Sequence, residues 1–292
     1  MSHVSFESAA SLPLGRLATL FSRSFEGYFF PFELSQEKLA ERVRIEHLDL
    51  HASSILVVDG EPSGVALLGV RGDRAWCGGF GLLPRFRGKG LALALTRHML
   101  AVAGTSGATR CTLEVLCQNE RAIRVYASAG FRPVRDLVTL EWARPDARDA
   151  LGTTVAPAIA LANVDARELL RGFDELVPAC WQRDLPTLLG VGGLQGVALD
   201  DESDRRAWAI FRLDPPGTKA NPPAARIAAL GMRDVGAGER LLAELKNRFA
   251  KLLVVNEPAE SQSTHALSAA GFVEVHRQHE MAIDLAPRKA PP

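Results

Sequence analysis

Hydrophobic and polar positions follow two different periods along the first half of the chain. A helical period marks some segments, and Ser35 is a natural N-cap for the second of them. Two apolar runs meet at an Asp-Gly pair, which predicts a β-hairpin. The expected helices cover 14–25, 36–47, 91–103 and 119–130, and the expected strands cover 53–60, 63–70, 75–83, 109–116 and 131–142. This order predicts an α+β (mixed α/β) fold.

The same order of elements recurs after a polar stretch at 143–152, which we interpret as a linker. A helix expected over 166–176 is followed by a second hairpin pattern and a second glycine pair. Three residues return after 148 positions: Arg85, Gly88 and Gly90 become Arg233, Gly236 and Gly238. We therefore predict a duplication, with one domain at 1–143 and another at 153–286, followed by a disordered tail at 287–292.

Charge and cysteine usage narrow the class of protein. Lys plus Arg and Asp plus Glu number 34 each, so no global basic field favours nucleic acid or an anionic membrane. No apolar run approaches the roughly 18 residues of a membrane span, and the first residues do not resemble a signal peptide. The four cysteines form no CxxC pair and do not cluster with histidines in the sequence, so we expect no metal site. We expect a cytoplasmic protein in which Cys77, Cys111 and Cys117 are small core residues.

The segment LLPRFRGKGLALAL, residues 82–95, joins an expected strand to an expected helix. A glycine-rich turn at a helix N-terminus exposes backbone N–H groups, and the helix dipole adds partial positive charge, so a phosphate group binds there. Arg87 and Lys89 would add charge-assisted contacts. The alternative is a solvated basic turn before a surface helix.

The run Arg87-Gly88-Lys89-Gly90-Leu91-Ala92, three residues after Pro84, resembles motif A of the GNAT (GCN5-related N-acetyltransferase) superfamily. A register starting at Arg85 also fits. Residues 113–131, with Asn119, Tyr126 and the Gly-Phe pair at the end, resemble motif B of the same superfamily. The resemblance covers about residues 10–142 and implies two tandem GNAT-fold domains, each with a mixed, mostly antiparallel sheet flanked by helices.

The resemblance implies acetyl-CoA as co-substrate, with no metal. The acetyl-CoA would lie in the cleft where strands 75–83 and 109–116 separate, with its pyrophosphate on residues 87–92. The pantetheine arm would follow the strand backbone and contact Asn119. The implied cofactor-binding residues are Phe80, Gly81, Leu82, Arg87, Gly88, Lys89, Gly90, Leu91, Ala92 and Asn119.

Acetyl transfer to an amine needs a proton acceptor for the amine and an acid for the leaving thiolate. By resemblance Tyr126 is the acid; the alternative is an aromatic residue packed on its helix. Glu114 matches a glutamate that acts as base in some members, and otherwise is a polar strand residue that pairs with a neighbour. Glu26 and His47 are weaker candidates for the base.

The segment FEGYFFPFE, residues 25–33, would lie in the loop that shapes the acceptor site in this superfamily. Its aromatic residues line an apolar acceptor pocket, form core, or pack on the second domain. The second domain is interpreted as degenerate, because residues of the two motifs are replaced there: Val235 for Arg87, Arg240 for Ala92, Glu260 for Asn119 and Leu267 for Tyr126. It is expected to be structural or to complete the acceptor site; the alternative is an anion site at Arg233, Gly236 and Gly238.

The expected function is an acetyl-CoA-dependent N-acetyltransferase in which a primary amine attacks directly in a ternary complex. The alternative is a non-catalytic acyl-CoA-binding sensor or a partner-binding protein. The acceptor would be a small-molecule or peptide amine, and neither nucleic acid nor membrane is an expected partner. The sequence leaves the acceptor and the oligomeric state open, with a homodimer among the options.

Overall fold

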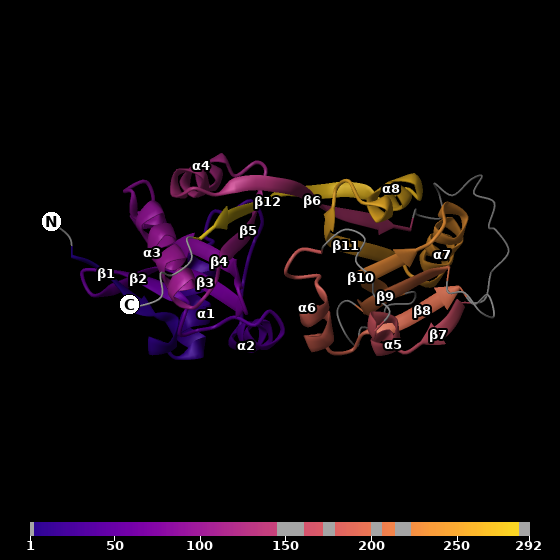
Figure 1. Ribbon diagram of the computed structural model, residues 1–292, viewed down its shortest axis with the longest axis horizontal. Coiled ribbons are helices and arrows are strands. Elements are labelled where there is room, and N and C mark those ends of the chain that lie inside the picture. Colours follow the sequence, from indigo (N-terminus) through magenta and orange to yellow (C-terminus); the bar gives the residue numbers. More distant parts are fainter. Residues whose placement is uncertain (1–2, 145–160, 172–178, 200–205, 214–222, 286–292) are drawn as a thin grey trace, which may run out of the picture. The chain divides into compact units, whose positions relative to one another are not determined.

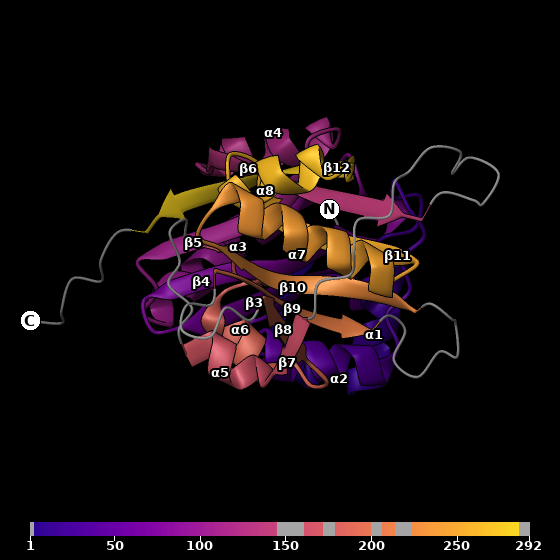
Figure 2. The same ribbon diagram turned by 90° about the vertical axis from the view of Figure 1, so that its right-hand side faces the viewer.

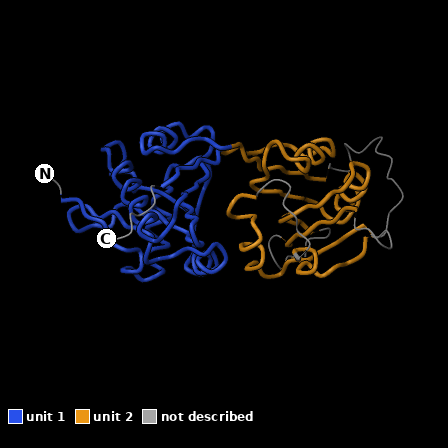
Figure 3. The backbone as a smooth tube through the Cα atoms, in the orientation of Figure 1, with its two compact units in different colours: residues 1–134, 279–292 blue, residues 135–278 orange. Residues whose placement is uncertain are grey.

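The computed structural model describes residues 3–144, 161–171, 179–199, 206–213 and 223–285. The chain divides into two compact units, shown in Figure 3: unit 1 comprises 1–134 and 279–292, and unit 2 comprises 135–278. Most of the expected linker, the end of the helix expected at 166–176 and the tail lie outside the described residues. Within the described ranges, no helix combines the length and hydropathy that a bilayer span needs.

Unit 1 is built on a mixed sheet in the order β1-β2-β3-β4-β5, followed by residues 279–284 of β12. Neighbours from β1 to β4 run antiparallel, and β4 and β5 run parallel. The strands are β1 (Val4–Ser8), β2 (Ser54–Val58), β3 (Glu61–Arg71), β4 (Arg74–Leu82), β5 (Arg110–Leu116) and β12 (Val273–Asp284). Two short 3-10 turns, η1 (Ala9–Ser11) and η2 (Pro84–Phe86), follow β1 and β4.

Helices cover both faces of this sheet (Figure 1). Leu95 and Met99 of α3 pack with Ala66 and other residues on one face. Successive strand residues point to opposite faces, so the neighbouring position, Leu67, and its cross-strand partner Gly79 face the other way. There a Cβ on Gly79 would meet the ring of Phe21 in α1 at 2.4 Å. The helices are α1 (Leu14–Arg23), α2 (Gln36–Ile45), α3 (Leu91–Thr105) and α4 (Glu120–Ala129).

Each half of the sequence ends in a strand that extends into the other unit. Strand β6 (Arg132–Ala143) runs into unit 2 and pairs antiparallel with β11 (Lys251–Pro258). The final residues of β12 return to unit 1, where Met281 is 1% exposed in the core and the Leu285 N–H donates to the Thr109 carbonyl at 2.7 Å. The units therefore divide differently from the boundaries expected at 1–143 and 153–286, because most of β6 belongs to unit 2 and the end of β12 belongs to unit 1.

Unit 2 repeats the order of elements of unit 1. Its sheet order is β12-β6-β11-β10-β9-β8-β7, with β12 contributing residues 273–278, and β10 and β11 run parallel. Figure 2 shows α7 and α8 over one face of these strands, where Leu241, Leu242 and Leu245 enter the core. The remaining elements are β7 (Leu161–Val164), α5 (Ala166–Arg171), α6 (Leu185–Gly190), β8 (Gln195–Leu199), β9 (Ala207–Leu213), β10 (Ala224–Met232), α7 (Val235–Arg248) and α8 (Gln262–Ala269). The expected fold class of two mixed, mostly antiparallel sheets flanked by helices is confirmed.

Candidate active site

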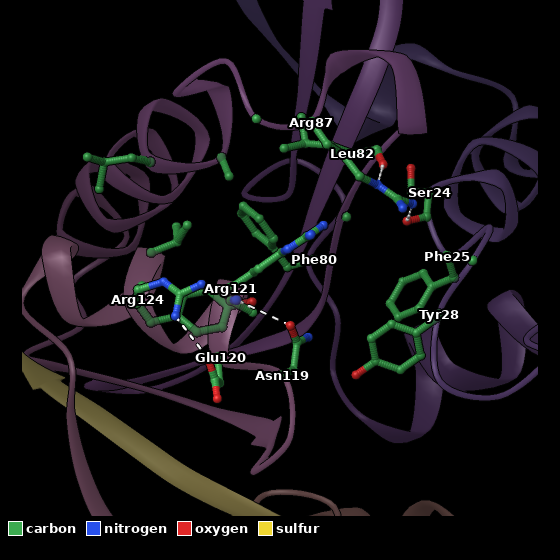
Figure 4. A pocket seen from close by; sticks show the side chains of 18 of the residues that line it. Ser24, Phe25, Tyr28, Phe80, Leu82, Arg87, Asn119, Glu120, Arg121 and Arg124 are labelled. Atoms are coloured by element: carbon green, nitrogen blue, oxygen red, sulfur yellow. Dashed lines mark hydrogen bonds and ion pairs between the residues drawn. The ribbon is translucent and has the colours of Figure 1, made fainter.

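Unit 1 contains a cavity of about 850 Å³. Its wall is formed by the end of β4, the segment that follows α1, the turn before α3 and the first turns of α4 (Figure 4). The expected site residues on this wall are Phe80, Gly81, Leu82, Arg87, Gly88, Gly90, Ala92, Asn119 and Tyr126. Lys89, Leu91 and Glu114 do not line the cavity. The structure thus brings together most of both motifs.

The cavity opens where β4 and β5 separate. Their parallel register runs from Arg74 opposite Arg110 to Cys77 opposite Leu113, and β4 then continues alone on that side to Leu82. On its other edge β4 stays paired with β3 as far as Leu82. The result is a strand edge that borders the cavity.

A close backbone approach explains the glycine at position 81. A Cβ there would lie 2.7 Å from the Ser24 Cβ and 2.9 Å from the Ser24 carbonyl oxygen. The end of α1 therefore packs directly on the strand, a close backbone approach of the kind that glycine in a strand permits. The cavity wall includes Ser24, Phe25, Gly27, Tyr28 and Phe29 from the segment that begins at this contact.

The turn before α3 has the geometry of an anion cradle. Gly88 has φ +76° and Gly90 has φ +77°, a region that other residues rarely adopt. Gly90 is the N-cap of α3 and supplies no side chain, so no side chain caps the N-terminal N–H groups of this helix. Both glycines and Ala92 line the cavity, which directs the positive end of the helix dipole into it.

The Arg87 side chain has a different set of partners from those expected. Its guanidinium donates to three backbone carbonyls: Leu82 at 2.9 Å, Ser24 at 3.1 Å and Glu26 at 2.9 Å. Figure 4 shows it directed toward the end of α1. Lys89 also points elsewhere, with Nζ 5.7 Å from the centre of the Phe86 ring. Both cations thus have protein partners in this structure, while the helix N-terminus beside them has no side-chain cap.

Asn119 is engaged at the start of α4. Its Oδ1 accepts from the Ala122 N–H at 3.2 Å, which caps the helix as the sequence predicts. Its side chain also hydrogen-bonds Tyr28, which lines the cavity from the loop after α1. Burial raises the pKa of Tyr28, and this hydrogen bond offsets part of the rise.

Tyr126 lies buried in the cavity wall. Its ring makes edge contacts with Phe80, centroids 5.7 Å apart, and with Phe131, 5.9 Å apart. Burial raises the pKa of Tyr126 well above its ordinary value, and the nearby Cys77 and Tyr28 add to the rise. The phenol is therefore protonated at neutral pH, as an acid must be before it acts.

The candidates for the base lie away from this cavity wall. Glu114 accepts the Trp76 indole N–H at 2.7 Å. Leu113 and Val115 pack in the core that includes Tyr126, and strand alternation turns Glu114 to the other face. Glu26 is exposed and pairs with Arg23, and His47 lies outside the cavity, with Nδ1 3.1 Å from the Arg71 Nε.

The cysteines divide into two groups. Burial raises the pKa of Cys77 to about 12, and it raises that of Cys111 further, as expected of core thiols. Cys117 is only partly buried, and its Sγ lies 3.7 Å from Nδ1 of His279. Cys117 is thus less buried than the core residue that was expected, and a histidine distant in the sequence lies beside it because the end of β12 returns to unit 1.

Sequence reasoning missed several lining residues. Arg121 and Arg124 extend from the first turns of α4, and Arg124 pairs with Glu120 at 3.1 Å. A readable signal exists for Arg121: Arg121, Ala122 and Val125 are spaced at three and four residues and so lie on one face of the helix. The remaining lining residues not singled out before are Ser24, Leu93, Gln118 and Ser128.

The glycine pair of unit 2 is not equivalent to that of unit 1. Helix α7 begins at Val235, so Gly236 and Gly238 lie inside its first turns, and a Cβ on Gly238 would lie 2.4 Å from the Met232 sulfur. The N-cap is Asp234, whose Oδ1 accepts from the Ala237 N–H at 2.7 Å. A carboxylate at this position opposes a bound anion, so the alternative of an anion site at Arg233, Gly236 and Gly238 is not supported.

The other expected replacements in unit 2 fit a domain without this cavity. Leu267 is fully buried in the core, and Val235 is 63% exposed. Glu260 and Arg240 are exposed. None of these side chains reproduces the environment of Tyr126 or Asn119.

Comparisons with known proteins agree with this geometry. A family model described as Acetyltransferase (GNAT) family matches residues 16–131, which contain the whole cavity wall. Proteins of Mycobacterium bovis and Mycobacterium tuberculosis, each named an uncharacterized N-acetyltransferase, are 42% identical over 76 residues, which is 25% of this chain and 48% of theirs. The chain thus spans about half the length of these curated relatives.

Two solved structures resemble the chain over nearly its full length. A tandem GNAT protein from the clavulanic acid biosynthesis pathway matches 99% of this chain and 100% of its own, with 16% identity and a TM-score of 0.68. A GCN5-related N-acetyltransferase from Sphaerobacter thermophilus matches 98% of this chain and 96% of its own, with 17% identity and a TM-score of 0.65. Residues 16–131, which lie in unit 1, thus match the GNAT acetyltransferase family, and the two units together have the fold of a solved tandem GNAT protein.

Proposed function

We propose that unit 1 is an acetyl-CoA-dependent N-acetyltransferase that transfers the acetyl group to a primary amine by direct attack in a ternary complex. One observation carries the proposal: a buried, protonated Tyr126 faces the same cavity as an uncapped helix N-terminus and the β4 edge. An acid, an anion cradle and a strand edge are the three features that thioester transfer from a phosphate-bearing carrier needs.

The residues present fit acetyl-CoA. Backbone N–H groups at Gly88, Gly90 and the start of α3 would bind the pyrophosphate. Past Cys77 the backbone of residues 80–82 has an edge that β5 does not pair, which suits the amides of the pantetheine arm. When bound, acetyl-CoA supplies the activated acetyl group.

In the proposed reaction the amine nitrogen bonds to the acyl carbon and the carbon–sulfur bond breaks. The amine gives up one proton to solvent, directly or through a relay, the sulfur accepts one from Tyr126, and solvent then returns a proton to the phenolate. Each pKa unit by which the phenol exceeds the thiol adds about 1.4 kcal/mol to full proton transfer. The raised pKa of Tyr126 keeps the phenol protonated as a donor to the departing sulfur, and full transfer is completed only as negative charge develops there.

Removal of the amine proton is assigned to solvent water or to a relay that reaches Glu114. The Trp76 indole already holds one carboxylate oxygen of Glu114, and that side chain does not line the cavity. Direct contact with the amine is therefore not part of the proposal. Unit 2 is proposed to act structurally, because its helix cap and core residues oppose a second acyl-CoA site.

The test compares Tyr126→Phe with Tyr28→Phe, which removes the other phenol of the same cavity. Tyr126→Phe is expected to lower the turnover number about 100-fold or more, since general acid catalysis contributes factors of this size. Acetyl-CoA affinity, measured by calorimetry, is expected to stay within about threefold in both variants. Tyr28→Phe is expected to retain turnover, measured as release of free thiol.

The two candidate functions give different results. An acyl-CoA sensor binds acetyl-CoA but releases no thiol with any amine, and Tyr126→Phe changes nothing. Failure of the wild type to bind acetyl-CoA contradicts both.

A further inference from the structure

The loop between α1 and α2 contributes aromatic rings to two environments. Its Phe25 and Phe32 pack against the buried Phe21 of α1, with ring centroids 4.9 to 5.5 Å apart. Tyr28 and Phe29 form the next edge contact, 5.1 Å apart, and both line the cavity together with Phe25. The loop thus packs on a core residue and also forms part of the cavity wall.

Half of the Phe29 side chain is left exposed by the fold. It is 50% exposed, although it borders the cavity. Phe80 lines the cavity from β4, where its ring meets that of Tyr126. A ligand whose amine approaches Tyr126 therefore has aromatic side chains beside it, from the loop and from the strand.

The charged groups of the cavity wall disfavour a polycation. Among the described lining residues, Glu120 is the carboxylate, and Arg124 pairs with it at 3.1 Å. Arg87 and Arg121 add two positive charges. Among the described side chains of the wall, a second ammonium group on the acceptor would therefore meet cations and no carboxylate outside the Glu120–Arg124 pair, which opposes binding.

From these observations we propose that the acceptor is a primary amine carried on an aromatic or bulky apolar body with no second positive charge. The body contacts Phe25, Tyr28 and Phe29, and the amine reaches the acyl carbon beside Tyr126. This rests on the proposed function, and it narrows the open range of amines to one chemical class. Phe29 is then a specificity-determining residue.

The test uses release of free thiol from acetyl-CoA with 2-phenylethylamine, ethylamine and spermidine as probes. The wild type is expected to have the highest kcat/KM for 2-phenylethylamine. Phe29→Ser is expected to lower that value about 10-fold, the size of effect that loss of an apolar pocket contact produces, while leaving ethylamine nearly unchanged. Phe30→Ser is the matched control, because Phe30 is 37% exposed in the same loop but does not line the cavity.

Three results would overturn the proposal. A higher kcat/KM for spermidine assigns the cavity to polycations. An equal loss for all three amines in Phe29→Ser gives Phe29 a role in loop structure alone. A Phe29→Ser effect that appears with longer acyl-CoAs but not with the amines assigns the aromatic wall to the acyl chain.

A second measurement distinguishes failure of the acceptor class from failure of the proposed acetyl transfer. If acetyl-CoA binds but no amine releases thiol, transfer is refuted. The acceptor class is then read from calorimetric titration of the same amines into the acetyl-CoA complex. Tighter binding of 2-phenylethylamine, weakened about 10-fold by Phe29→Ser, still supports the class. Tighter binding of spermidine overturns it.

Discussion

The three hydrogen bonds of Arg87 predict that this residue holds the aromatic loop in place rather than a phosphate group. Its guanidinium joins the end of β4, through the Leu82 carbonyl, to the carbonyls of Ser24 and Glu26 after α1. Arg87→Ala removes all three donors at once. The segment after α1 would then lose its polar attachment to the strand, although the packing of Ser24 on Gly81 remains.

The size of the effect follows from the burial of each bond. Hydrogen bonds from a charged donor contribute about 1.5–3 kcal/mol each when protected from solvent. Two of the three bonds are partly buried, and the bond to Glu26 is exposed, so water replaces it at little cost. At the lower end of that range the loss is about 3 kcal/mol, which raises the open population of the loop about 100-fold.

Limited proteolysis with chymotrypsin measures this opening, because the loop carries several Phe and Tyr residues. We expect the cleavage rate within 25–32 to rise about 100-fold in Arg87→Ala. Arg87→Lys should give an intermediate rate, since one ammonium cannot span three carbonyls. Lys89→Ala is the control, because it removes a neighbouring cation that contacts Phe86 instead.

Acetyl-CoA binding distinguishes Arg87 as a residue that holds the loop from Arg87 as a phosphate ligand, the role expected from the sequence. If Arg87 holds the loop, its loss should change the acetyl-CoA dissociation constant by less than about threefold. An unchanged cleavage rate with affinity weakened tenfold or more would make Arg87 a phosphate ligand and refute the reasoning.

Two further predictions follow from the glycine turn and the core thiols. Gly90→Ala should cost about 1–2 kcal/mol of stability because of its positive φ, and should also weaken acetyl-CoA binding. Asp234→Ala should cost about 1 kcal/mol through loss of the α7 cap and leave acetyl-CoA binding unchanged, so calorimetry and urea denaturation of the pair test whether unit 1 alone binds. Burial raises the pKa of Cys77 from 9.0 to about 12, so the stability that depends on its neutral thiol is complete below pH 9 and is lost as the pH rises to about 12. Cys77→Ala should make the fall in unfolding free energy between pH 9 and 11 less steep, and an equally steep fall would contradict that assignment.

Features set by local backbone chemistry could be predicted from the sequence. Gly88 and Gly90 adopt positive φ in the turn where they were expected, and Ser35 and Asn119 cap the expected helices. Tyr126 lies on the cavity wall because its position relative to the Asn119 cap fixes its place on α4. These outcomes depend on neighbours within a few residues.

Features set by distant partners could not be predicted. Arg87 stands in a sequence that is typical of a phosphate site, but its partners lie 61 and 63 residues away. Gly236 and Gly238 of unit 2 occupy the same sequence spacing as Gly88 and Gly90 but not the same structure. Asp234 caps a helix that begins before them. The sequences of β6 and β12 do not show which unit each strand joins. In the structure β6 pairs with β11 of unit 2, and the end of β12 belongs to unit 1.

The return of the end of β12 to unit 1 has a consequence for the order in which the two units can fold. During vectorial synthesis unit 1 stays incomplete until residues 279–284 emerge, because Met281 fills its core and the backbone after Asp284 pairs with Thr109. Deletion of the second half of the chain would therefore also remove the segment that fills the core of unit 1, so the cavity-bearing unit depends on both halves of the sequence.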